Sequence, residues 1–446
     1  MKFKDIVINA FRVKELRKKM FMTLMLIIIF RIGCFIPVPG LNESAFSALA
    51  GNGMFKLYDM LSGGAFQQVS LFAMTISPYI NASIIVQLLT VAIPVFERWQ
   101  KEGPEGRKKI QKLTRGLTIG LALFQAIMMY FNIQGSTINL FSEPGSFDFF
   151  TFAIVILSFT AGTSVLMWLG ERITEVGIGN GISMLIFAGI VANAPAAGTM
   201  LYNIISNPDN YYASGMILRI LFVLAIVLVF LAVIIAVVWV EGGERRIPVQ
   251  YAKRVVGRKV YGGQNTNIPL KVNSTGVLPI IFAMSILQFP ATIVAFMGKS
   301  GATTGFAGFI NEFSSGTGWI YILVYALLIV GFTFFYNIVY FDPVDIANNL
   351  KKNGGFVPGL RPGAPTADYI KKSSKRITWF GAIFLAILAI APSILGKVAS
   401  YIKPGASTIN LWFGGTTVLI LVGVALETVR QLESQLLMRN YKGFLD

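Results

Sequence analysis

The sequence predicts an all-α integral membrane protein with ten transmembrane helices, arranged as two five-helix halves of opposite orientation. Three observations support this fold class. Of the 446 residues, 54% are hydrophobic and only 13% are charged, with a mean hydropathy of +0.66, which is too apolar for a soluble globule. The apolar residues form ten long blocks, and lysine and arginine concentrate in every second connection between them.

Composition excludes several kinds of site. The sequence has no histidine and a single cysteine, Cys34. We therefore expect no cofactor, no disulfide, no histidine proton relay, and no zinc, haem or iron–sulfur site built from Cys and His. No Walker lysine motif appears, so the chain is not expected to hydrolyse nucleotides itself. The first 20 residues are basic and amphipathic without a small-residue cleavage site, so we expect no removable signal peptide.

Each apolar block is long enough to cross about 30 Å of hydrocarbon as a helix. A cytosolic segment, residues 1–20, precedes an N-terminal half, 21–194; an outer connection, 195–215, leads to a C-terminal half, 216–430, and a tail, 431–446. Because each half has an odd number of spans, the second half is inverted relative to the first. The predicted spans are residues 21–38, 74–95, 116–133, 149–170, 178–194, 216–240, 276–297, 319–341, 377–395 and 411–429.

Orientation follows from the positive charges, because Lys and Arg in short loops stay on the cytosolic side of a membrane. The N-terminal segment and the loops 96–115, 241–275 and 342–376 each contain seven Lys and Arg, whereas the alternate loops together contain four. Both termini are therefore predicted to be cytosolic. The six tryptophans lie at span ends, where their amphipathic rings prefer the headgroup level. This distribution explains most of the net charge of +17 without a nucleic-acid partner.

The outer loop after the first span is unusually apolar. Leu57 to Phe72 is mostly hydrophobic, contains Gly63 and Gly64, and is too short to span. A re-entrant segment, buried in protein or filling a cavity, would satisfy its backbone polar groups. A helix lying on the outer leaflet is the alternative, and the sequence does not choose between the two.

The cytosolic loops 241–275 and 342–376 are too short and too polar to fold alone. In the first loop, basic residues lie among strand-forming residues, which predicts a protruding hairpin. These basic residues are Arg245, Arg246, Lys253, Arg254, Arg258 and Lys259. The second loop contains the turn GLRPG at 359–363, which would hold Arg361 in a fixed place. The alternative for this loop is a solvated segment that only sets topology.

Polar residues are scarce inside the spans. Their central parts contain one charged residue, Arg31, and a charge there costs about 3 kcal/mol on insertion scales. Arg31 is therefore expected to face protein, water or another subunit in a structural role, with a partner that the sequence does not identify. The Gly-rich run Gly177–Gly181 follows a span rather than a strand, so close backbone packing at a helix start is favoured over a nucleotide site.

Pairs of isoleucines recur on two spans. Ile80 and Ile84, and likewise Ile186 and Ile190, are four residues apart and share a helix face. On the residues alone, lipid contact or helix packing is favoured over a pore constriction, which would gate by dewetting.

Several longer segments carry a family resemblance over essentially the whole chain. They are Phe30–Gly33 with Ile36–Pro39, Pro78–Leu89, Gly177–Ile182 with Ile186–Val191, Arg246–Arg254, Pro269–Asn273, Gly276–Phe282, Asp342–Gly363 and Gly414–Ile420. On these residues the chain resembles SecY, the channel subunit of the bacterial Sec protein translocase, the SecYEG translocon.

The resemblance implies a clamshell of two halves around an hourglass pore, which is closed by an apolar ring and, on the outer side, by a short plug helix at about residues 58–68. It assigns Ile80, Ile84, Ile186, Ile190, Ile281 and Ile420 to the ring, and Tyr58, Leu61, Gly63, Gly64 and Phe66 to the plug. An apolar ring can close around an unfolded chain of any sequence while offering ions no substitute for hydration. The resemblance also implies a lateral gate, formed by the second and third spans against the seventh and eighth.

The resemblance further implies partners and a location. The basic loops resemble a docking surface for the SecA motor ATPase and the translating ribosome, with contacts from Arg245, Arg246, Lys253, Arg254, Arg258 and Arg361. Small membrane subunits like SecE and SecG, unfolded preproteins, signal peptides and lipid are the other implied partners, and no specific DNA binding is expected. The location is the bacterial cytoplasmic membrane. The chain itself is expected to be a passive channel rather than an enzyme, with ATP hydrolysis in SecA.

Two other function classes are compatible with ten spans. A secondary transporter with inverted repeats would need a charged or strongly polar site near the midplane, which this sequence lacks. A membrane-embedded enzyme would need histidine, paired intramembrane carboxylates or a supported nucleophile. The sequence therefore favours a protein-conducting channel over both.

Overall fold

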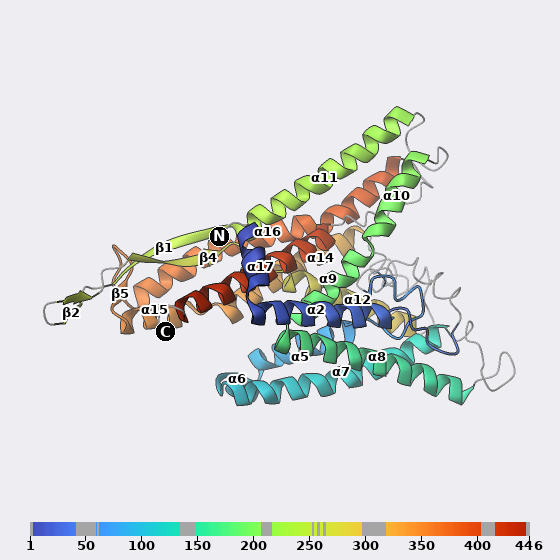
Figure 1. Cartoon of the computed structure of the whole chain (residues 1–446), viewed down its shortest axis with the longest axis horizontal. Coiled ribbons are helices and arrows are strands. Elements are labelled where there is room, and N and C mark those ends of the chain that lie inside the picture. The colour runs from blue at the N-terminus through green and yellow to red at the C-terminus, as the bar shows by residue number, and fades with distance from the viewer. Residues whose placement is uncertain are drawn as a thin grey trace.

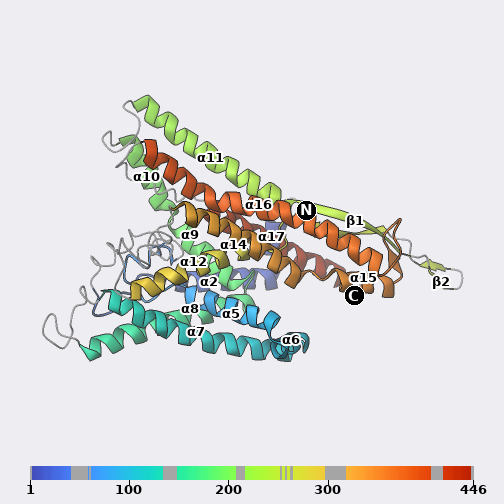
Figure 2. The same cartoon turned by 180° about the vertical axis from the view of Figure 1, so that it is seen from behind.

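The computed structural model describes residues 3–41, 59, 62–133, 148–206, 216–251, 254–256, 259–261, 265–296, 318–402 and 415–442. Within these ranges the chain is a bundle of long helices with a slender β ribbon protruding from one end (Figure 1). Figure 2 shows the same bundle from behind, where α14 and α16 run side by side.

The helices of the N-terminal half begin with a short amphipathic helix, α1. They are α1 (Phe3–Arg12), α2 (Lys14–Gly33), α5 (Ser77–Ala92), α6 (Pro94–Lys101), α7 (Pro104–Ile133), α8 (Phe149–Val176), α9 (Gly181–Ala192) and α10 (Ala194–Ser206). The Asp148 carboxylate caps α8 by accepting a hydrogen bond from Phe150 N, and the side chain of Asn180 caps α9 in the same way. The chain bends by 99° between α5 and α6, where Pro94 begins a new helix.

The C-terminal half combines five long helices with the ribbon. Its helices are α11 (Met216–Gly242), α12 (Leu278–Phe296), α14 (Trp319–Tyr340), α15 (Pro343–Lys352), α16 (Ala364–Ile402) and α17 (Gly415–Lys442). Its strands are β1 (Glu244–Tyr251), β2 (Arg254–Val256), β3 (Lys259–Tyr261), β4 (Asn265–Lys271) and β5 (Gly355–Phe356). Asp342 caps α15, with a proline at the first helical position.

Each of the ten predicted spans coincides with at least part of one of the long helices. Among the described residues, seven helices are long and apolar enough to cross a membrane, and eight if α5 and α6 form one broken span. The first span falls outside that count because α2 begins with a charged stretch, and in the seventh the run Leu278–Leu287 is counted as a shorter apolar helix.

Some boundaries differ from the prediction. Helix α2 ends at Gly33, before the predicted end at 38, because Cys34 and Phe35 form a turn and Pro37 then pairs with Ser70 in an isolated antiparallel bridge. The predicted outer connection, 195–215, starts as helix, since α10 continues to Ser206. Helix α16 exceeds its predicted span at both ends.

The two halves meet along two lines of contact. On one side α12 packs against α5 and α7, and on the other α17 packs against α9. A single large apolar cluster contains residues from both halves, including side chains of α5, α9, α12, α14 and α17. This cluster therefore spans both halves, whereas a second cluster, which includes Phe66, Tyr130 and Phe159, lies inside the N-terminal half.

The ribbon is one module built from both large loops. Strands β1 and β4 pair antiparallel, with Ile247 opposite Ile268, and β5 adds to the end of β1 through Tyr251 and Gly355. A small apolar cluster lies beneath, formed by Ile247, Val249, Leu270, Leu350, Val357 and Ile370. Neither loop has enough apolar residues alone, so the two fold together. We call this assembly, β1–β5 with α15 and the start of α16, the ribbon module.

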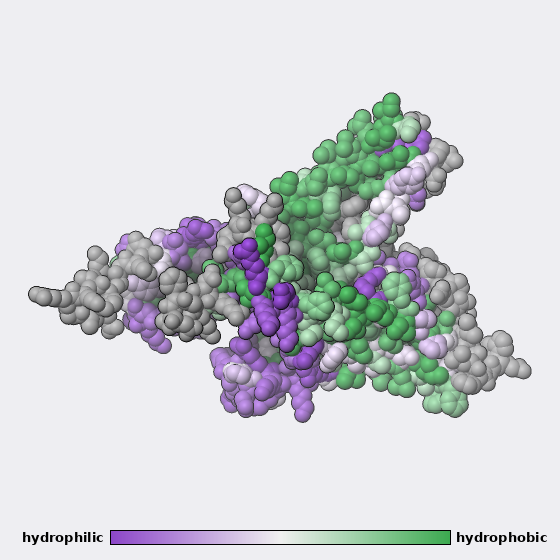
Figure 3. Space-filling view, viewed as in Figure 1, coloured by the Kyte–Doolittle hydropathy of each residue, from purple (hydrophilic) through white to green (hydrophobic). Residues whose placement is uncertain are grey.

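Surface hydropathy divides the molecule into two zones. Figure 3 shows apolar residues over α11 and the sides of the bundle, and hydrophilic residues toward the ribbon end. On α11 the side chains of Ile217, Ile235 and Trp239 are all largely exposed. Such a band is what a helical bundle presents to lipid.

Candidate functional site: an apolar constriction between two halves

The structure brings the six predicted ring isoleucines into one apolar cluster. Ile80 and Ile84 lie on α5, Ile186 and Ile190 on α9, Ile281 on α12, and Ile420 on α17. Five of them are at most 6% exposed, and Ile281 is partly buried against the same cluster. Two helices come from each half, so the cluster crosses the boundary between them. We call these six side chains the apolar ring; that they close a pore stays a prediction.

Helix α9 is positioned by the Gly-rich run that precedes it, which we call the α9 elbow (residues 177–181). Ile178 N donates to Thr23 Oγ1 at 3.0 Å, Gly179 N donates to Gln431 Oε1 at 2.9 Å, and Gly181 N donates to Thr174 Oγ1 at 2.9 Å. These acceptors come from α2, α17 and α8. The predicted close backbone packing at a helix start is confirmed.

Much of the described chain that leads into α5 is buried. In residues 62–76, which we call the re-entrant segment, Ala65, Phe66 and Ser70 are at most 1% exposed. From Gly63 to Ile76 the backbone makes successive turns rather than a helix. This burial favours the re-entrant arrangement over a helix lying on the outer leaflet.

The base of the re-entrant segment is held by backbone hydrogen bonds to the chain after α2. Val38 N donates to Val69 O and Leu71 N donates to Ile36 O, both at 2.9 Å. Val69 has φ +50°, which is rare for a β-branched residue and costs on the order of 1–3 kcal/mol. The strained turn persists because these hydrogen bonds hold both of its sides.

The start of the segment, Ser62 and Gly63, which we call its tip, contacts the C-terminal end of α2. Arg31 Nη1 donates to Gly63 O at 3.1 Å, and Cys34 Sγ donates to Ser62 O at 3.7 Å. Asp59 also stabilises this turn, because its Oδ1 accepts from Gln67 N at 3.2 Å. Burial raises the pKa of the Asp59 carboxyl, and the hydrogen bond from Gln67 N opposes part of that rise. The intramembrane arginine, whose partner the sequence does not identify, thus contacts a backbone carbonyl.

A further polar contact joins α14 to α5 across the interface between the halves. Tyr336 OH on α14 donates to Gln87 Oε1 on α5 at 2.7 Å. The Tyr336 ring packs against Phe282 of α12, with ring centroids 5.0 Å apart. Sequence reasoning missed this pair, although a glutamine and a tyrosine within apolar spans are the signal that could have identified it.

A polar cavity of about 430 Å³ opens between the halves on the ribbon side of the apolar ring. Its lining includes Asn180 of α9, Ile281 of the ring and Arg430 of α17. Glu241 Oε1 accepts from Asn273 Nδ2 at 2.6 Å within it. The cavity brings polar side chains up to Ile281 of the apolar ring.

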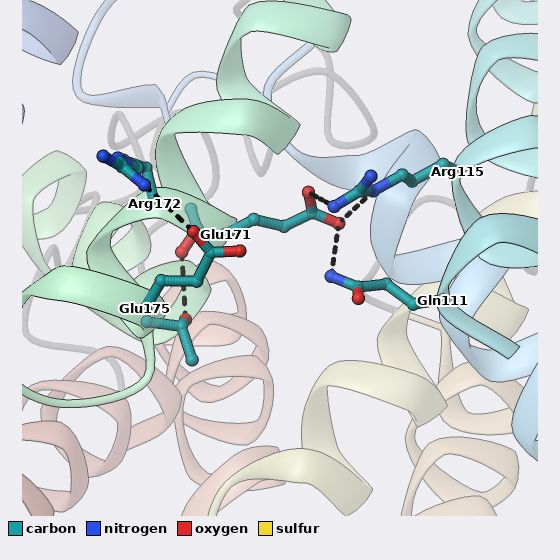
Figure 4. Close-up of polar contacts among 7 residues, drawn as sticks. Gln111, Arg115, Glu171, Arg172 and Glu175 are labelled. Atoms are coloured by element: carbon teal, nitrogen blue, oxygen red, sulfur yellow. Dashed lines mark hydrogen bonds and ion pairs between the residues drawn. The ribbon is translucent and has the colours of Figure 1, made fainter. Parts of the chain in front are cut away.

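An ion pair joins α7 to α8 near their ribbon-side ends. Arg115 contacts both Glu171 oxygens, at 2.9 Å and 2.7 Å, and Gln111 Nε2 donates to Glu171 Oε1 at 3.1 Å (Figure 4). The Glu171 side chain is only 10% exposed. The neighbouring pair, Arg172 with Glu175, is exposed on the same helix.

The predicted docking residues lie partly within the described chain. Arg245 and Arg246 are exposed on β1, and Arg246 pairs with Glu244 at 2.6 Å. Arg361 is exposed in its turn, where its carbonyl accepts from Thr366 Oγ1 at 2.8 Å. Arg254 belongs to β2. Four predicted site residues lie outside the described residues: Tyr58, Leu61, Lys253 and Arg258.

The chain is similar to known proteins along nearly its full length. The family model SecY matches residues 70–429. The protein translocase subunit SecY of Streptomyces scabiei is 45% identical over 450 residues, covering 98% of each chain. That of Thermotoga maritima is 42% identical over 446 residues, covering 98% of this chain and 96% of the relative.

Solved structures share the fold at low sequence identity. A protein-conducting channel matches with a TM-score of 0.64 and 19% identity, covering 94% of this chain and 92% of that one. A SecY structure, in which the plug domain is said to stabilise the closed state of the translocation channel and maintain a membrane seal, matches with a TM-score of 0.61 and 19% identity, with the same coverage. Sec61 of the canine ribosome–channel complex matches with 0.60 and 18%, again with that coverage.

These similarities identify the fold as the ten-helix clamshell of two inverted halves. The family model covers the α9 elbow, the ribbon module and the second part of the re-entrant segment, and the two relatives cover 98% of the chain. The chain belongs to the SecY family.

Proposed function

We propose that this chain is the pore-forming subunit of a protein translocase. It passes unfolded secretory proteins across the cytoplasmic membrane and releases transmembrane segments laterally into it. The observation that carries this proposal is an apolar cluster between two membrane-spanning halves, which contains the six isoleucines of the apolar ring, in a chain of the SecY family.

The geometry supports a seal that does not depend on substrate sequence. Ions lose hydration energy in an apolar constriction that offers no replacement ligands, whereas isoleucine side chains can pack around any extended polypeptide. Residues 58–68 act as the plug beneath the ring, as the buried turns of the re-entrant segment support. The contacts of α12 with α5 and α7 form the lateral gate, with the Tyr336–Gln87 hydrogen bond between its two sides.

The ribbon module is the docking surface in this proposal. Arg245, Arg246 and Arg361 are exposed on it, with Lys253, Arg254 and Arg258 nearby in the chain, and Sec61 is known in a ribosome–channel complex. The ribosome or the SecA motor binds to the module, and SecA hydrolyses the ATP. SecE-like and SecG-like subunits complete the complex. The protein lies in the bacterial cytoplasmic membrane with both termini cytosolic, as the distribution of Lys and Arg supports.

Crosslinking a stalled secretory precursor tests the channel. Single cysteines replace Ile80, Ile186, Ile281 and Ile420 in a Cys34→Ser background, and Ile235→Cys on the exposed face of α11 is the control. We expect crosslinks at all four ring positions and none at 235. Crosslinks only at the control position would mean that the chain does not pass between the halves, and the transporter hypothesis would then replace the channel.

A charge reversal tests the docking surface. Arg361→Glu should reduce SecA-driven export of a precursor while leaving the amount of assembled protein unchanged. Lys375→Glu, an equal charge change at an exposed position of α16, is the matched control. Equal losses of export in both variants would show a general charge effect rather than docking at the turn.

A further inference from the structure

Arg31 lies in the last turn of α2, within the first predicted span, and its contact is unusual for a charge in such a segment. Its Nη1 donates to the carbonyl of Gly63 at 3.1 Å, and its guanidinium lies 5.4 Å from the centroid of the Phe35 ring. Within the described chain no carboxylate forms an ion pair with it. Its positive charge is therefore stabilised by a carbonyl dipole and an aromatic face.

The acceptor is the tip of the re-entrant segment, at a residue that has to be glycine. Gly63 has φ +69°, and a Cβ there would lie 2.6 Å from Arg31 Nη1 and 2.8 Å from the Gly189 carbonyl. Gly189 lies on α9 between Ile186 and Ile190 of the apolar ring. The absence of a side chain thus allows the tip to fit between the arginine and the helix that carries the ring.

We propose that Arg31 is a positioning residue that holds the re-entrant segment against the ring-bearing face of α9 in the resting channel. This inference rests on the proposed function and specifies how the seal is kept in place. The base of the segment is fixed by its backbone hydrogen bonds to residues 36 and 38. At the tip, the Arg31 contact is the charge-assisted one, beside the weaker contact of Cys34 Sγ with Ser62 O.

The contact also couples the movement of the segment to water entry. When the tip withdraws, the guanidinium loses its carbonyl acceptor in apolar surroundings, which is unfavourable unless water replaces it. If the tip withdraws and no water enters, the Arg31 guanidinium is left without a hydrogen-bond acceptor. If the tip stays in place, the buried segment keeps water away from Arg31. The two events therefore occur together, which keeps a partly open, leaking state scarce.

A second arginine provides a matched control. Arg219 on α11 also donates to a backbone carbonyl, that of Ile205 on α10, at 3.0 Å. Its contact has the same chemistry but involves no residue of the re-entrant segment. Arg31→Gln and Arg219→Gln each remove one positive charge from the chain, and only the first alters the seal.

The position of the segment can be measured without any transport assay. Cys34 Sγ lies 3.7 Å from the backbone carbonyl of Ser62, so Ser62→Cys adds a second thiol on the residue that Cys34 contacts, and the rate of disulfide formation at a fixed concentration of oxidant reports where the tip lies. We expect Arg31→Gln to slow this reaction about tenfold, the equilibrium equivalent of one charge-assisted hydrogen bond, and Arg219→Gln to leave it unchanged. Gly63→Ala, which keeps the Arg31 charge beside the Cys34 thiol, should slow it as well, because it displaces the tip without changing that charge.

Resting ion conductance of the purified protein in planar bilayers is the second readout. Arg31→Gln should raise the conductance by about the same tenfold factor. Arg31→Lys should give an intermediate conductance, because lysine keeps the charge but lacks the planar guanidinium. Gly63→Ala should also raise the conductance, because it disturbs the acceptor side of the same hydrogen bond. Oxidation of the Ser62→Cys variant should restore the seal in Arg31→Gln.

Three outcomes would overturn the proposal: wild-type disulfide rates in Arg31→Gln, equal effects of both arginine variants, or a leak that oxidation does not reverse. If Arg31→Gln fails to assemble, Arg31→Lys and Gly63→Ala give the same test. The disulfide rate does not depend on transport, so a failure of the translocase function would appear in precursor crosslinking and leave this readout unaffected.

Discussion

Helices α11 and α17 both cross the apolar layer of the bundle, yet they are built in opposite ways. Over their most apolar stretches, α11 has a mean hydropathy of 3.6 with 6% of residues buried, whereas α17 has 1.3 with 50% buried. The helix that is more hydrophobic is thus the one that the protein covers least. In a soluble protein the relation would be reversed.

The difference between α11 and α17 shows which residue types indicate helix–helix contact inside a membrane. Lipid is as apolar as leucine, so hydrophobicity gives no preference for helix contact, and small or polar residues that permit close approach decide it. Helix α17 begins with Gly415, Thr416 and Thr417, all buried, while α11 is an almost continuous run of large aliphatic residues. We expect substitutions to follow this division.

The largest effect is expected at the close contact between α17 and α16. A Cβ on Gly415 would lie 2.1 Å from the Leu388 carbonyl, so Gly415→Val should destabilise the protein by about 3 kcal/mol, at the upper end of overpacking. The midpoint of SDS-induced unfolding in detergent micelles measures this. Gly331→Val on α14 is the control, since nothing lies within 4 Å of that position; a similar loss there would break the comparison.

The next effect is expected where a charge is buried between helices. Glu171→Gln removes the charge that binds Arg115 at two points and should cost about 1.5 kcal/mol, as for hydrogen bonds to charged groups. A double-mutant cycle with Arg115→Gln measures the coupling. Glu175→Gln removes the exposed partner of Arg172 and should change stability by less than about 0.5 kcal/mol. Equal costs for the two glutamates would contradict the assignment.

A smaller effect is expected between the halves. Tyr336→Phe removes the hydrogen bond to Gln87 and should cost about 0.6 kcal/mol, the average for polar contacts within membranes, in the same unfolding assay. Tyr325→Phe is the matched change, because the Tyr325 hydroxyl is buried and has no hydrogen-bond partner among the described residues. That variant should be neutral or more stable; a loss larger than that of Tyr336→Phe would refute the role of the Gln87 contact.

The smallest effect is expected on α11. Ile235 is 68% exposed, so Ile235→Ala should change stability by less than about 0.5 kcal/mol, because the removed atoms contact lipid rather than protein. Unfolding of the isolated chain in micelles is the measurement. A loss of several times that amount would show that α11 contacts the protein over more of its surface than the structure indicates.

The sequence predicts the ten helices and the hairpin because these follow from local patterns: apolar runs of spanning length, alternating basic and strand-forming residues, and turn residues such as Gly359 and Pro362. It does not predict α10, since the composition of residues 195–206 suits a loop equally well. Nor does it predict the partner of Arg31, because a backbone carbonyl has no sequence signature and lies 32 residues away. The Tyr336–Gln87 contact joins residues 249 positions apart, which no periodicity encodes.

The α9 elbow makes α9 a lever with a fixed pivot. Its three hydrogen bonds tie the start of the helix to α2, α8 and α17, so rotation of one half against the other acts on a rod held at one end. At 1.5 Å per residue, Ile186 lies about 7 Å and Ile190 about 13 Å beyond Gly181. A small rotation about the elbow therefore displaces Ile190 nearly twice as far as Ile186, so in the channel that we propose such a rotation widens the apolar ring most at the end farthest from the elbow.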